Sequence, residues 1–283
     1  MTAAFDQRII KVGIEIDGTI EVFDKVKIDA TGTKFRAADQ STANIRIYNL
    51  TREHRQYILT KASPSVLLPK PINVSLDVGR ESYGTFRLFE GAVYQGGVSQ
   101  PPDIGIMLQS LTNNYLLMNT TVASFPEYAS LHQIASTIAG QIGCTLLLKS
   151  KNPERKISNY SFTGSPQKQV QKLNEMGVVA FVDNKVLVVV DPQQSRSDDI
   201  FTISAASGMV GVPQPTTDGC LVRTMIGQGI EVGNEVRIES DVNPGVNGNY
   251  IIIQLDFEIS NRDEPFYYVL RCQNKEFFFG TTS

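Results

Sequence analysis

The chain has few of the residue types on which enzyme sites depend. Its 283 residues contain no tryptophan, only three cysteines and only two histidines, His54 and His132. A catalytic triad or a Cys–His pair would have to use one of these histidines. His54 lies in a charged stretch and His132 lies one position from an apolar helix stripe, so we interpret both as structural, half-exposed residues. The sequence predicts no catalytic residue and no enzyme.

Motifs for metals and cofactors are also missing. The three cysteines, Cys144, Cys220 and Cys272, are odd in number and widely separated, which favours small buried hydrophobic residues over a disulfide framework or a metal cluster. No Walker sequence, HExxH, CxxC or calcium-loop spacing occurs. The segment GQGIEVG at 227–233 superficially resembles a nucleotide-binding glycine loop, but it precedes a strand and not a helix. We therefore expect turn glycines, no cofactor and no metal.

The chain also lacks long hydrophobic runs and an excess of one charge. No segment approaches the roughly 18 to 20 apolar residues of a membrane helix, and the N-terminus has no signal-peptide core, so we expect no membrane partner and folding in a cytosol. The 26 basic and 29 acidic residues give a net charge of −3. This balance argues against nucleic acid as the main partner, because phosphate binding needs a concentrated positive field.

Strand patterns dominate residues 8–112. The Asp17-Gly18 dipeptide between two alternating runs predicts a β-hairpin. Residues 43–51, ANIRIYNLT, alternate as a strand and then place Thr51 as the N-cap of a short helix. About six strands with one short helix predict a compact β-barrel or sandwich, with the helix closing one end.

The middle of the chain has a different pattern. Apolar residues at steps of three and four predict a helix over 131–143 that is capped by Ser130, and Ser165-Pro166 starts a second helix. The run 178–190, VVAFVDNKVLVVV, predicts a hairpin that turns at Asp183-Asn184. Residues 125–198 are thus expected to form a small α+β domain.

Residues 199–274 return to strands. Apolar and polar residues alternate in YIIIQLDFEI. The expected apolar side consists of Ile251, Ile253, Leu255, Phe257 and Ile259, and the expected polar side consists of Gln254, Asp256 and Glu258. Each β region ends with a long strand, a polar connection and a final strand. The fold class is therefore mainly β with an α+β insert, in which two β-barrel or sandwich domains (1–124 and 199–283) flank the insert domain (125–198).

Several segments, taken in order, resemble the baseplate hub proteins of long-tailed, contractile bacteriophages. The segments are ANIRIYNLT, LFEGAVY, FTGSPQKQVQKLNEMGVVAFVDNKVLVVV, ISAASGMVGVPQPTTDGCLVRTMIGQGIEVGNEVRIES and NGNYIIIQLDF. The resemblance implies a structural homotrimer with two tube-like β-domains in each subunit. Such a hub joins the six-fold tail tube protein to the three-fold central spike protein in the virion baseplate, after assembly in the host cytoplasm. The tape measure protein and other baseplate proteins are further candidate partners, and DNA only passes through during genome ejection.

Two groups of residues are the candidate functional sites. Gln254, Asp256 and Glu258 are expected to line the channel, where a negative wall would not hold DNA. The triplet Phe277, Phe278 and Phe279 either docks on a partner or packs on the second β-domain of its own chain.

Three alternatives remain open. The chain could be the hub part of a secretion-system spike, a tail-associated cell-wall-degrading enzyme with the central domain as its catalytic unit, or a carbohydrate-binding protein. For the enzyme, Glu90, Asp256 and Glu258 are strand carboxylates of the kind that glycoside hydrolases use. Carboxylates that alternate on a solvated sheet face explain them more simply.

Overall fold

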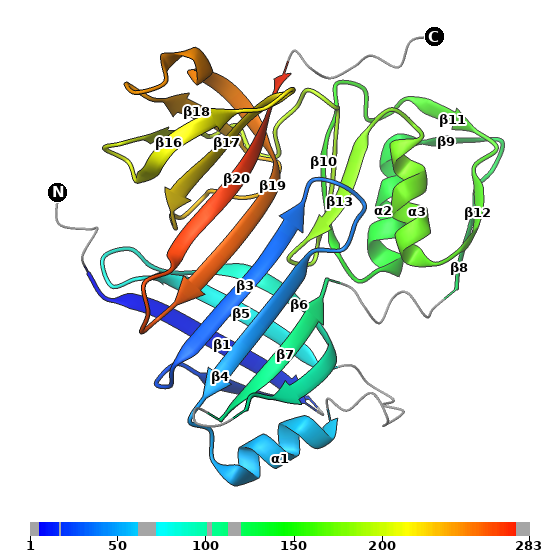
Figure 1. The fold of residues 1–283 in the computed structure, drawn as a ribbon. Coiled ribbons are helices and arrows are strands. Elements are labelled where there is room, and N and C mark those ends of the chain that lie inside the picture. Colours follow the sequence, from blue (N-terminus) through cyan, green and yellow to red (C-terminus); the bar gives the residue numbers. More distant parts are fainter. Residues whose placement is uncertain (1–5, 17, 62–71, 101–103, 113–119, 276–283) are drawn as a thin grey trace.

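The computed structural model describes residues 6–16, 18–61, 72–100, 104–112 and 120–275, and within these ranges the protein is mainly β (Figure 1). One large sheet takes strands from both ends of the chain, and a smaller unit with two helices lies beside it. In the part of the chain that is described, no helix is long and apolar enough to cross a membrane.

The first β region confirms the expected strands and hairpin. Its strands are β1 (Arg8–Ile16), β2 (Thr19–Phe23), β3 (Ile28–Phe35), β4 (Thr42–Tyr48), β5 (Asn73–Arg80), β6 (Gly84–Val98) and β7 (Gly105–Leu111). Strands β1 and β2 pair antiparallel up to Ile16 and Thr19. Between them Gly18 has a φ of 82°, which a residue without Cβ adopts without strain.

The transition from strand to helix after β4 is also confirmed. Helix α1 (Arg52–Lys61) begins after Thr51, whose Oγ1 accepts a hydrogen bond from the backbone N–H of His54 at 3.3 Å. On the inner side of the helix, Ile58 is fully buried in the main hydrophobic cluster. Helix α1 therefore covers one end of the first β region (Figure 1).

The insert has its own small sheets and core. Its elements are β8 (Thr121–Ser124), β9 (Tyr128–Ser130), α2 (Leu131–Gln141), β10 (Thr145–Lys149), β11 (Lys156–Ser158), β12 (Ser161–Gly164), α3 (Pro166–Asn174), β13 (Val179–Asp183) and β14 (Val186–Val190). Ser130 and Ser165 cap the two helices as expected. The β13–β14 turn lies at Asn184 and Lys185, both with positive φ, which is one residue later than predicted.

The second β region consists of β15 (Ile200–Ser204), β16 (Met209–Pro215), β17 (Gly219–Met225), β18 (Glu235–Glu239), the short 3-10 helix η2 (Pro244–Val246), β19 (Gly248–Ser260) and β20 (Phe266–Asn274). The expected regular alternation along β19 is wrong at one point. A bulge between Ile252 and Gln254 shifts the register against β20. Ile252, and not Ile253, therefore joins Leu255 in the main hydrophobic cluster.

The two β regions join edge to edge, which the sequence did not indicate. Strand β3 pairs antiparallel with β19 through Asp29–Phe35 and Gln254–Ser260. The resulting strand order is β16-β17-β20-β19-β3-β4-β7-β6-β5-β1-β2, and β18 pairs with the remaining part of the β19 edge. The described residues form no closed barrel. The free edge of β3 pairs with β19 of the second region and not with another strand of the first region.

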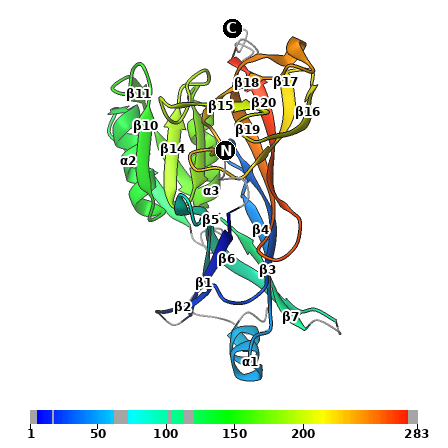
Figure 2. The same cartoon turned by 90° about the vertical axis from the view of Figure 1, so that its left-hand side faces the viewer.

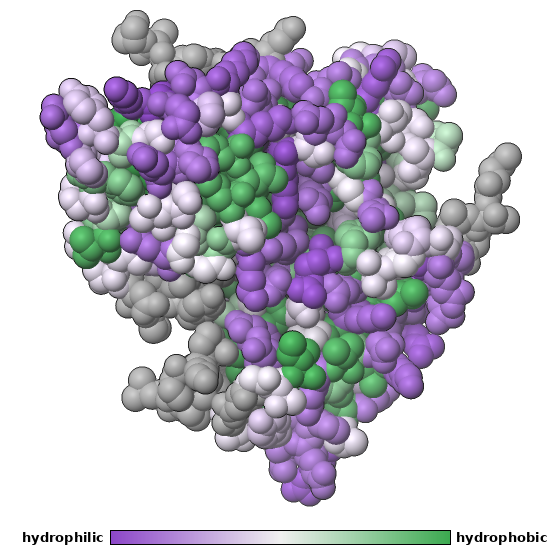
Figure 3. Space-filling model, turned by 180° about the vertical axis from the view of Figure 1, so that it is seen from behind, coloured by the Kyte–Doolittle hydropathy of each residue, from purple (hydrophilic) through white to green (hydrophobic). Residues whose placement is uncertain are grey.

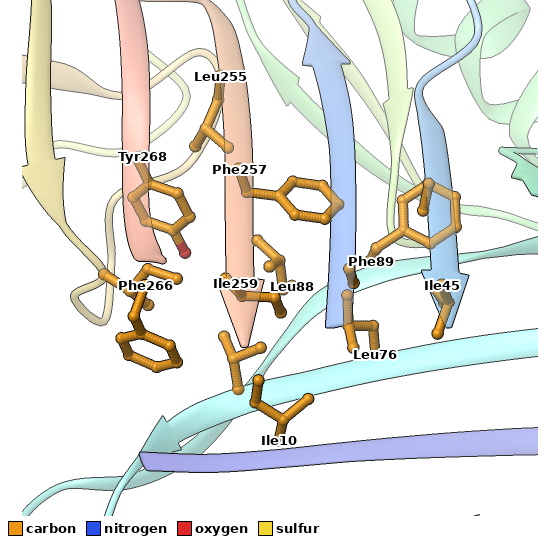
Figure 4. Packing of buried hydrophobic residues seen from close by; sticks show 14 of the residues in the cluster. Ile10, Ile45, Leu76, Leu88, Phe89, Leu255, Phe257, Ile259, Phe266 and Tyr268 are labelled. Carbon is orange, nitrogen blue, oxygen red and sulfur yellow. The ribbon is translucent and has the colours of Figure 1, made fainter. Parts of the chain in front are cut away.

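A single hydrophobic cluster spans both regions. Its buried side chains come from residues 10–108 and from residues 203–272. In Figure 4, Ile10 of the first region points toward Ile259 of the second, and Phe257 points toward strand β3. Gly32 of β3 leaves room for that ring, since a Cβ there would lie 2.3 Å from Phe257 Cζ. The joint is therefore packed like a protein core.

Both β regions use the same strand order. In the first region the order is β5-β6-β7-β4-β3, and in the second it is β18-β19-β20-β17-β16, with every neighbouring pair antiparallel. These strands correspond one to one in chain order. The expected likeness of layout between the two β regions thus extends to their strand pairing.

The long strands β6 and β19 also bulge at the same place. In β6 the register shifts between Val93 and Gln95, and in β19 it shifts between Ile252 and Gln254. Just before the bulge, Val93 N donates to Ile72 O at 2.8 Å, and Ile252 N donates to Asn234 O at 3.0 Å. In each region the bond links the long strand to the residue that directly precedes the neighbouring strand, β5 or β18. The two regions therefore correspond even at single residues.

Candidate functional site: the polar face of the central sheet

One face of the joined sheet carries polar side chains across both β regions. The pairing register aligns Glu258 of β19, Thr31 of β3, Asn44 of β4 and Gln109 of β7 in one row. Residues next to them in the sequence, such as Ile45 and Leu108, are buried on the opposite face. This alternation of polar and apolar residues makes one face of the sheet wet and the other face part of the core.

No helix formed by the described residues covers this polar face. Figure 2 shows the insert and strands β1, β5 and β6 on one side of β3, β4 and β19, with no helix on the other side. Two hollows of about 550 and 360 Å³ lie over the face. Thr31, Asn44 and Glu258 line both of them. The face is therefore hollowed where the two β regions meet.

The three residues expected to line a channel lie on this face, and hydrogen bonds hold two of their carboxylates. Asp256 Oδ1 accepts from Thr33 Oγ1 at 2.6 Å and from Gln254 Nε2 at 3.1 Å. Glu258 accepts from the hydroxyl of Tyr267, and this hydrogen bond is the main cause that raises the pKa of Tyr267. Neighbouring side chains therefore hydrogen-bond both carboxylates on the polar face.

The polar face is not uniformly acidic, in contrast to the expected negative wall. Arg46, Arg223 and Arg271 are exposed on the same face as Asp256 and Glu258. The Arg223 guanidinium lies 4.6 Å from the centre of the Tyr267 ring. The alternation within a single strand does not predict that these arginines lie on this face. The pairing of strands far apart in the sequence decides which charged side chains share a face.

A buried ionic cluster fixes the insert to the joint. Asp183 at the end of β13 accepts from Lys34 Nζ of β3 and from Arg196 Nη1, each at 2.6 Å. Arg196 also contacts Glu231 of the second β region at 3.1 Å. Burial alone would raise the pKa of Asp183, but the charges and hydrogen bonds of Lys34 and Arg196 outweigh it and lower the pKa. All three parts of the chain meet in this cluster, because Glu231 of the second β region joins it through Arg196.

The glycine loop forms turns as expected, whereas both histidines are exposed and not half-exposed. His54 and His132 are both exposed, and His54 Nδ1 lies 2.7 Å from Thr51 Oγ1 beside the helix cap. Gly229 and Gly233 adopt positive φ in turns before strand β18. Among the described residues, no group of three or more His, Cys, Asp or Glu is placed to hold a metal ion.

Two of the three cysteines lie side by side in the sheet, which the sequence did not predict. Cys220 and Cys272 are direct partners across β17 and β20, and both are fully buried. Their hydrogen bond and their burial raise the pKa of Cys272 well above its ordinary value. Burial likewise raises the pKa of Cys144 to about 11. The raised pKa makes the thiols of Cys144 and Cys272 poor nucleophiles.

The other predicted site lies outside the described residues, because Phe277, Phe278 and Phe279 belong to the segment 276–283. Elsewhere, apolar side chains form separate patches among hydrophilic ones on the rear of the molecule (Figure 3).

Comparison with known proteins places these features in context. The profile of the family described as Baseplate hub gp41 matches residues 9–272. No curated protein matches the chain. Among solved structures, the 43 kDa tail protein of prophage MuSo2 from Shewanella oneidensis is similar, with a TM-score of 0.63 and 11% identity over 96% of this chain and 97% of that one. A tail protein from Neisseria meningitidis gives a TM-score of 0.60 and 11% identity, covering 94% and 96%.

Two further solved structures share the fold. The E. coli c3393 protein is described as a type VI secretion component with structural similarity to the bacteriophage T4 tail proteins gp27 and gp5. It matches with a TM-score of 0.57 and 12% identity over 92% of this chain and 76% of that one. A chain of the Francisella PdpA–VgrG complex gives a TM-score of 0.57 and 10% identity over 96% and 59%. At such identities the likeness concerns the fold alone.

Proposed function

Because this chain belongs to the baseplate hub gp41 family, a family of structural phage tail proteins, we propose that it forms a homotrimeric hub. The hub joins the six-fold tail tube to the three-fold central spike and encloses part of the channel for genome ejection. The observation that carries this proposal is the repeated strand order in the two β regions. Three copies with two equivalent regions each present six similar modules to a six-fold tube, while the chain itself repeats three times toward the spike.

The division of the chain into 1–124, 125–198 and 199–283 is part of this proposal. In it, residues 1–124 and 199–283 are the tube-like modules, and the insert lies on the side of the sheet away from the polar face. The common core of the two β regions supports a rigid pair of modules, because moving one against the other would expose the packed joint.

We assign the polar face to the channel, with Gln254, Asp256 and Glu258 among its lining residues. Mixed charges give a hydrated wall that neither binds nor strongly repels passing DNA. Replacing Asp256 and Glu258 by arginine adds positive charge and should slow DNA release from triggered particles more than it reduces particle assembly. Intact particles with unchanged release would contradict the assignment of these residues to the channel.

The partners are the tail tube protein, the spike protein, the tape measure protein and other baseplate proteins, in the tail of the virion. The fold shared with a chain of a VgrG complex supports a spike partner. We propose that the triplet Phe277, Phe278 and Phe279 docks on a partner. Removal of residues 276–283 should weaken spike binding without lowering the thermal stability of the hub, whereas a loss of stability would indicate packing on the chain's own β region.

Light scattering on the purified full-length chain, alone and mixed with candidate spike protein, tests the proposal. We expect a particle of three times the mass of the chain, at least when the spike is present. A monomer under both conditions would contradict a trimeric hub. Clearing in a peptidoglycan zymogram would instead favour the tail-associated enzyme, and a specific hit on a glycan array would favour a carbohydrate-binding protein.

A further inference from the structure

We propose that the free edge of strand β10 in the insert binds an extended segment of another protein, which adds a fourth strand to the sheet β10-β14-β13. The bound segment is apolar along its centre and acidic at its two ends. The hub proposal assigns no partner to the insert, so this inference goes beyond that proposal and does not depend on the trimer.

Strand β10 (Thr145–Lys149) is an outermost strand of the insert sheet. Among the described residues it pairs with β14 alone, in parallel and without a register shift. Figure 2 shows β10 on the far side of β14 from strands β3 and β4 of the large sheet. Strand β13 at the opposite edge carries Asp183 into the joint. The β10 edge therefore lies on the outer side of the insert.

The hydrogen bonds of β10 show which backbone groups lie on its free edge. Thr145 N donates to the β13–β14 turn at 3.0 Å, and Lys149 O accepts from Asp191 N at 3.2 Å, so both residues turn their peptide groups toward β14. This orientation alternates along a strand, and the N–H and C=O groups of Leu146 and Leu148 therefore point away from β14. Within the described part of the chain, these four groups form no hydrogen bond. An added strand would provide their partners.

The two edges of the insert sheet differ in how they are protected. At the β13 edge, Ala180 N donates to Asn174 Oδ1 at 2.6 Å, and the carboxylate of Asp183 is buried in the ionic cluster at the strand end. Proteins commonly protect a free edge with proline, charge or a bulge. Strand β10 instead has three consecutive leucines and one charged residue, Lys149, at its end. Its edge is therefore open to strand addition, a mode by which many domains bind extended peptides.

The leucines of β10 offer apolar contacts to both faces of an added strand. Leu146 and Leu148 pack at the margin of the insert core, and Leu147 packs with the cluster on the opposite face of the sheet that contains Phe181. All three leucine side chains are half-buried. Apolar side chains on a fourth strand would cover their exposed parts, which polar side chains would leave in contact with water. The occupant is therefore apolar along the length of β10.

Lysines lie at both ends of the β10 edge. Lys149 and Lys151 are at the C-terminal end of the strand, and the backbone carbonyl of Lys185 accepts the hydrogen bond from Thr145 at the other end. The side chains of Lys149 and Lys185 each pair with one carboxylate. Lys151 is exposed and forms no ion pair with any described residue. A segment with an acidic residue at each end would therefore gain attractive charge pairs at both ends.

The same lysines disfavour a second copy of this chain as the occupant. If two β10 edges paired antiparallel, the Lys149 end of each copy would lie beside the Lys185 end of the other. Like charges would then meet at both ends, and such juxtaposition is destabilising. A partner protein with an extended segment that is apolar in its centre and acidic at its ends fits the edge better.

Binding of a designed peptide to the full-length chain tests the edge. The probe is a fluorescein-labelled peptide of nine residues, with five β-branched apolar residues between two pairs of glutamates, and fluorescence anisotropy measures its affinity. A peptide of the same sequence with alternate backbone amides methylated keeps the side chains but cannot pair as a strand, so we expect its affinity to be lower by about tenfold or more. A peptide with lysines in place of the glutamates should also bind more weakly, and added salt should reduce this difference.

Variants of β10 locate the binding to this edge. Leu148→Pro removes an outward N–H but no hydrogen bond to β14, and proline is tolerated on edge strands. Leu148→Ala is the matched control, because it shortens the same side chain and keeps the N–H. We expect Leu148→Pro to weaken binding about tenfold more than Leu148→Ala does, with the melting temperature of each variant as the check of folding.

A charge variant keeps the test valid if the proline variant does not fold. Lys151→Glu reverses an exposed charge beside the edge and should weaken binding of the glutamate peptide. Lys168→Glu is the matched control, since this lysine is also exposed but belongs to helix α3. Equal affinity of the two charge variants would contradict the predicted acidic ends of the partner.

No saturable binding of the glutamate peptide, or equal binding of the methylated peptide, would overturn the proposal. Binding that appears only after removal of residues 276–283 would overturn it in favour of the chain's own C-terminal segment. Self-association that Leu148→Pro abolishes and Leu148→Ala does not would overturn it in favour of a second copy. None of these results bears on the hub proposal, which is tested by the mass of the assembled particle and not by peptide binding to the insert.

Discussion

Strands β4 and β17 hold corresponding places in the two β regions, but the segments after them differ. After β4 the chain forms helix α1, which buries Ile58 at one end of the first region. After β17 it forms a glycine-rich loop, in which Val232 packs against Phe181 of the insert. The first strands differ as well, because β1 is antiparallel to β5 whereas β15 is parallel to β18. The shared strands form the common sheet, and the unshared parts determine which neighbours each region touches.

Another difference concerns β3 and β16, which are the last strands in the strand order that the two regions share. Strand β3 is held at the joint by the buried ion pair of Lys34 with Asp183, whereas β16 is an exposed edge with two prolines. The inner joint is therefore buried and ionically fixed, whereas the β16 edge is exposed. Variants at the inner joint and in helix α1 test this difference between the two regions.

Removing the lysine at the inner joint should have the largest effect. Lys34→Met leaves the buried Asp183 carboxylate with one partner fewer, and breaking such a pair costs about 3–5 kcal/mol of unfolding free energy. Denaturant unfolding measures the loss. Lys149→Met is the matched control, because its partner Asp198 is exposed and a surface pair contributes about 0–1 kcal/mol. Similar losses for both variants would show that the joint is not held by this pair.

The same carboxylate should make the joint sensitive to acid. Its pKa is lower in the folded protein than in the unfolded chain, so its stabilising contribution is present above the unfolded pKa and disappears as the pH falls through the folded pKa. Asp183→Asn cannot titrate and should lose less stability than the parent chain between neutral and acid pH. Parallel stability–pH curves of the two proteins would contradict the proposed role of Asp183.

Filling the space at Gly32 should have a smaller effect on the joint. In Gly32→Ala the new Cβ would lie 2.3 Å from both Phe257 Cζ and Thr42 O. Overpacking of this kind costs about 1–3 kcal/mol. Thermal unfolding measures it, with Gly140→Ala as control, because a Cβ on that residue of α2 meets nothing within 4 Å. If both substitutions are tolerated equally, the two regions are not tightly packed at β3 and β19.

The smallest effect is expected for the element found only in the first region. Thr51→Ala removes the N-cap of helix α1 and should cost about 1 kcal/mol. Hydrogen exchange should become faster in Arg52–Lys61 and remain unchanged in the loop after β17. Equal changes in both regions would mean that the end covered by the helix is coupled to the whole sheet.

Much of the fold can be predicted from local sequence patterns. The Asp17-Gly18 hairpin, the caps at Thr51, Ser130 and Ser165, and most strands were predicted because they depend on residues close in sequence. The joint between β3 and β19 could not be predicted in this way. It pairs residues more than 200 positions apart and depends on the packing of the Phe257 ring over Gly32.

The candidate site was predicted only in part for the same reason. Alternation placed Asp256 and Glu258 on a polar strand face, which the structure also has. Arg46 and Arg223 share that face only because β4 and β17 belong to the same sheet. The Cys220–Cys272 pair shows the same limit, since the two residues are neighbours in register but 52 positions apart in sequence.

Electron cryo-microscopy of the assembled tail is the most direct test of the two β regions as equivalents. The account predicts three copies around the channel, with both regions of each copy at one radius and height and the polar face inward. A single copy in the baseplate, or two β regions at different radii with their polar faces away from the channel, would contradict it.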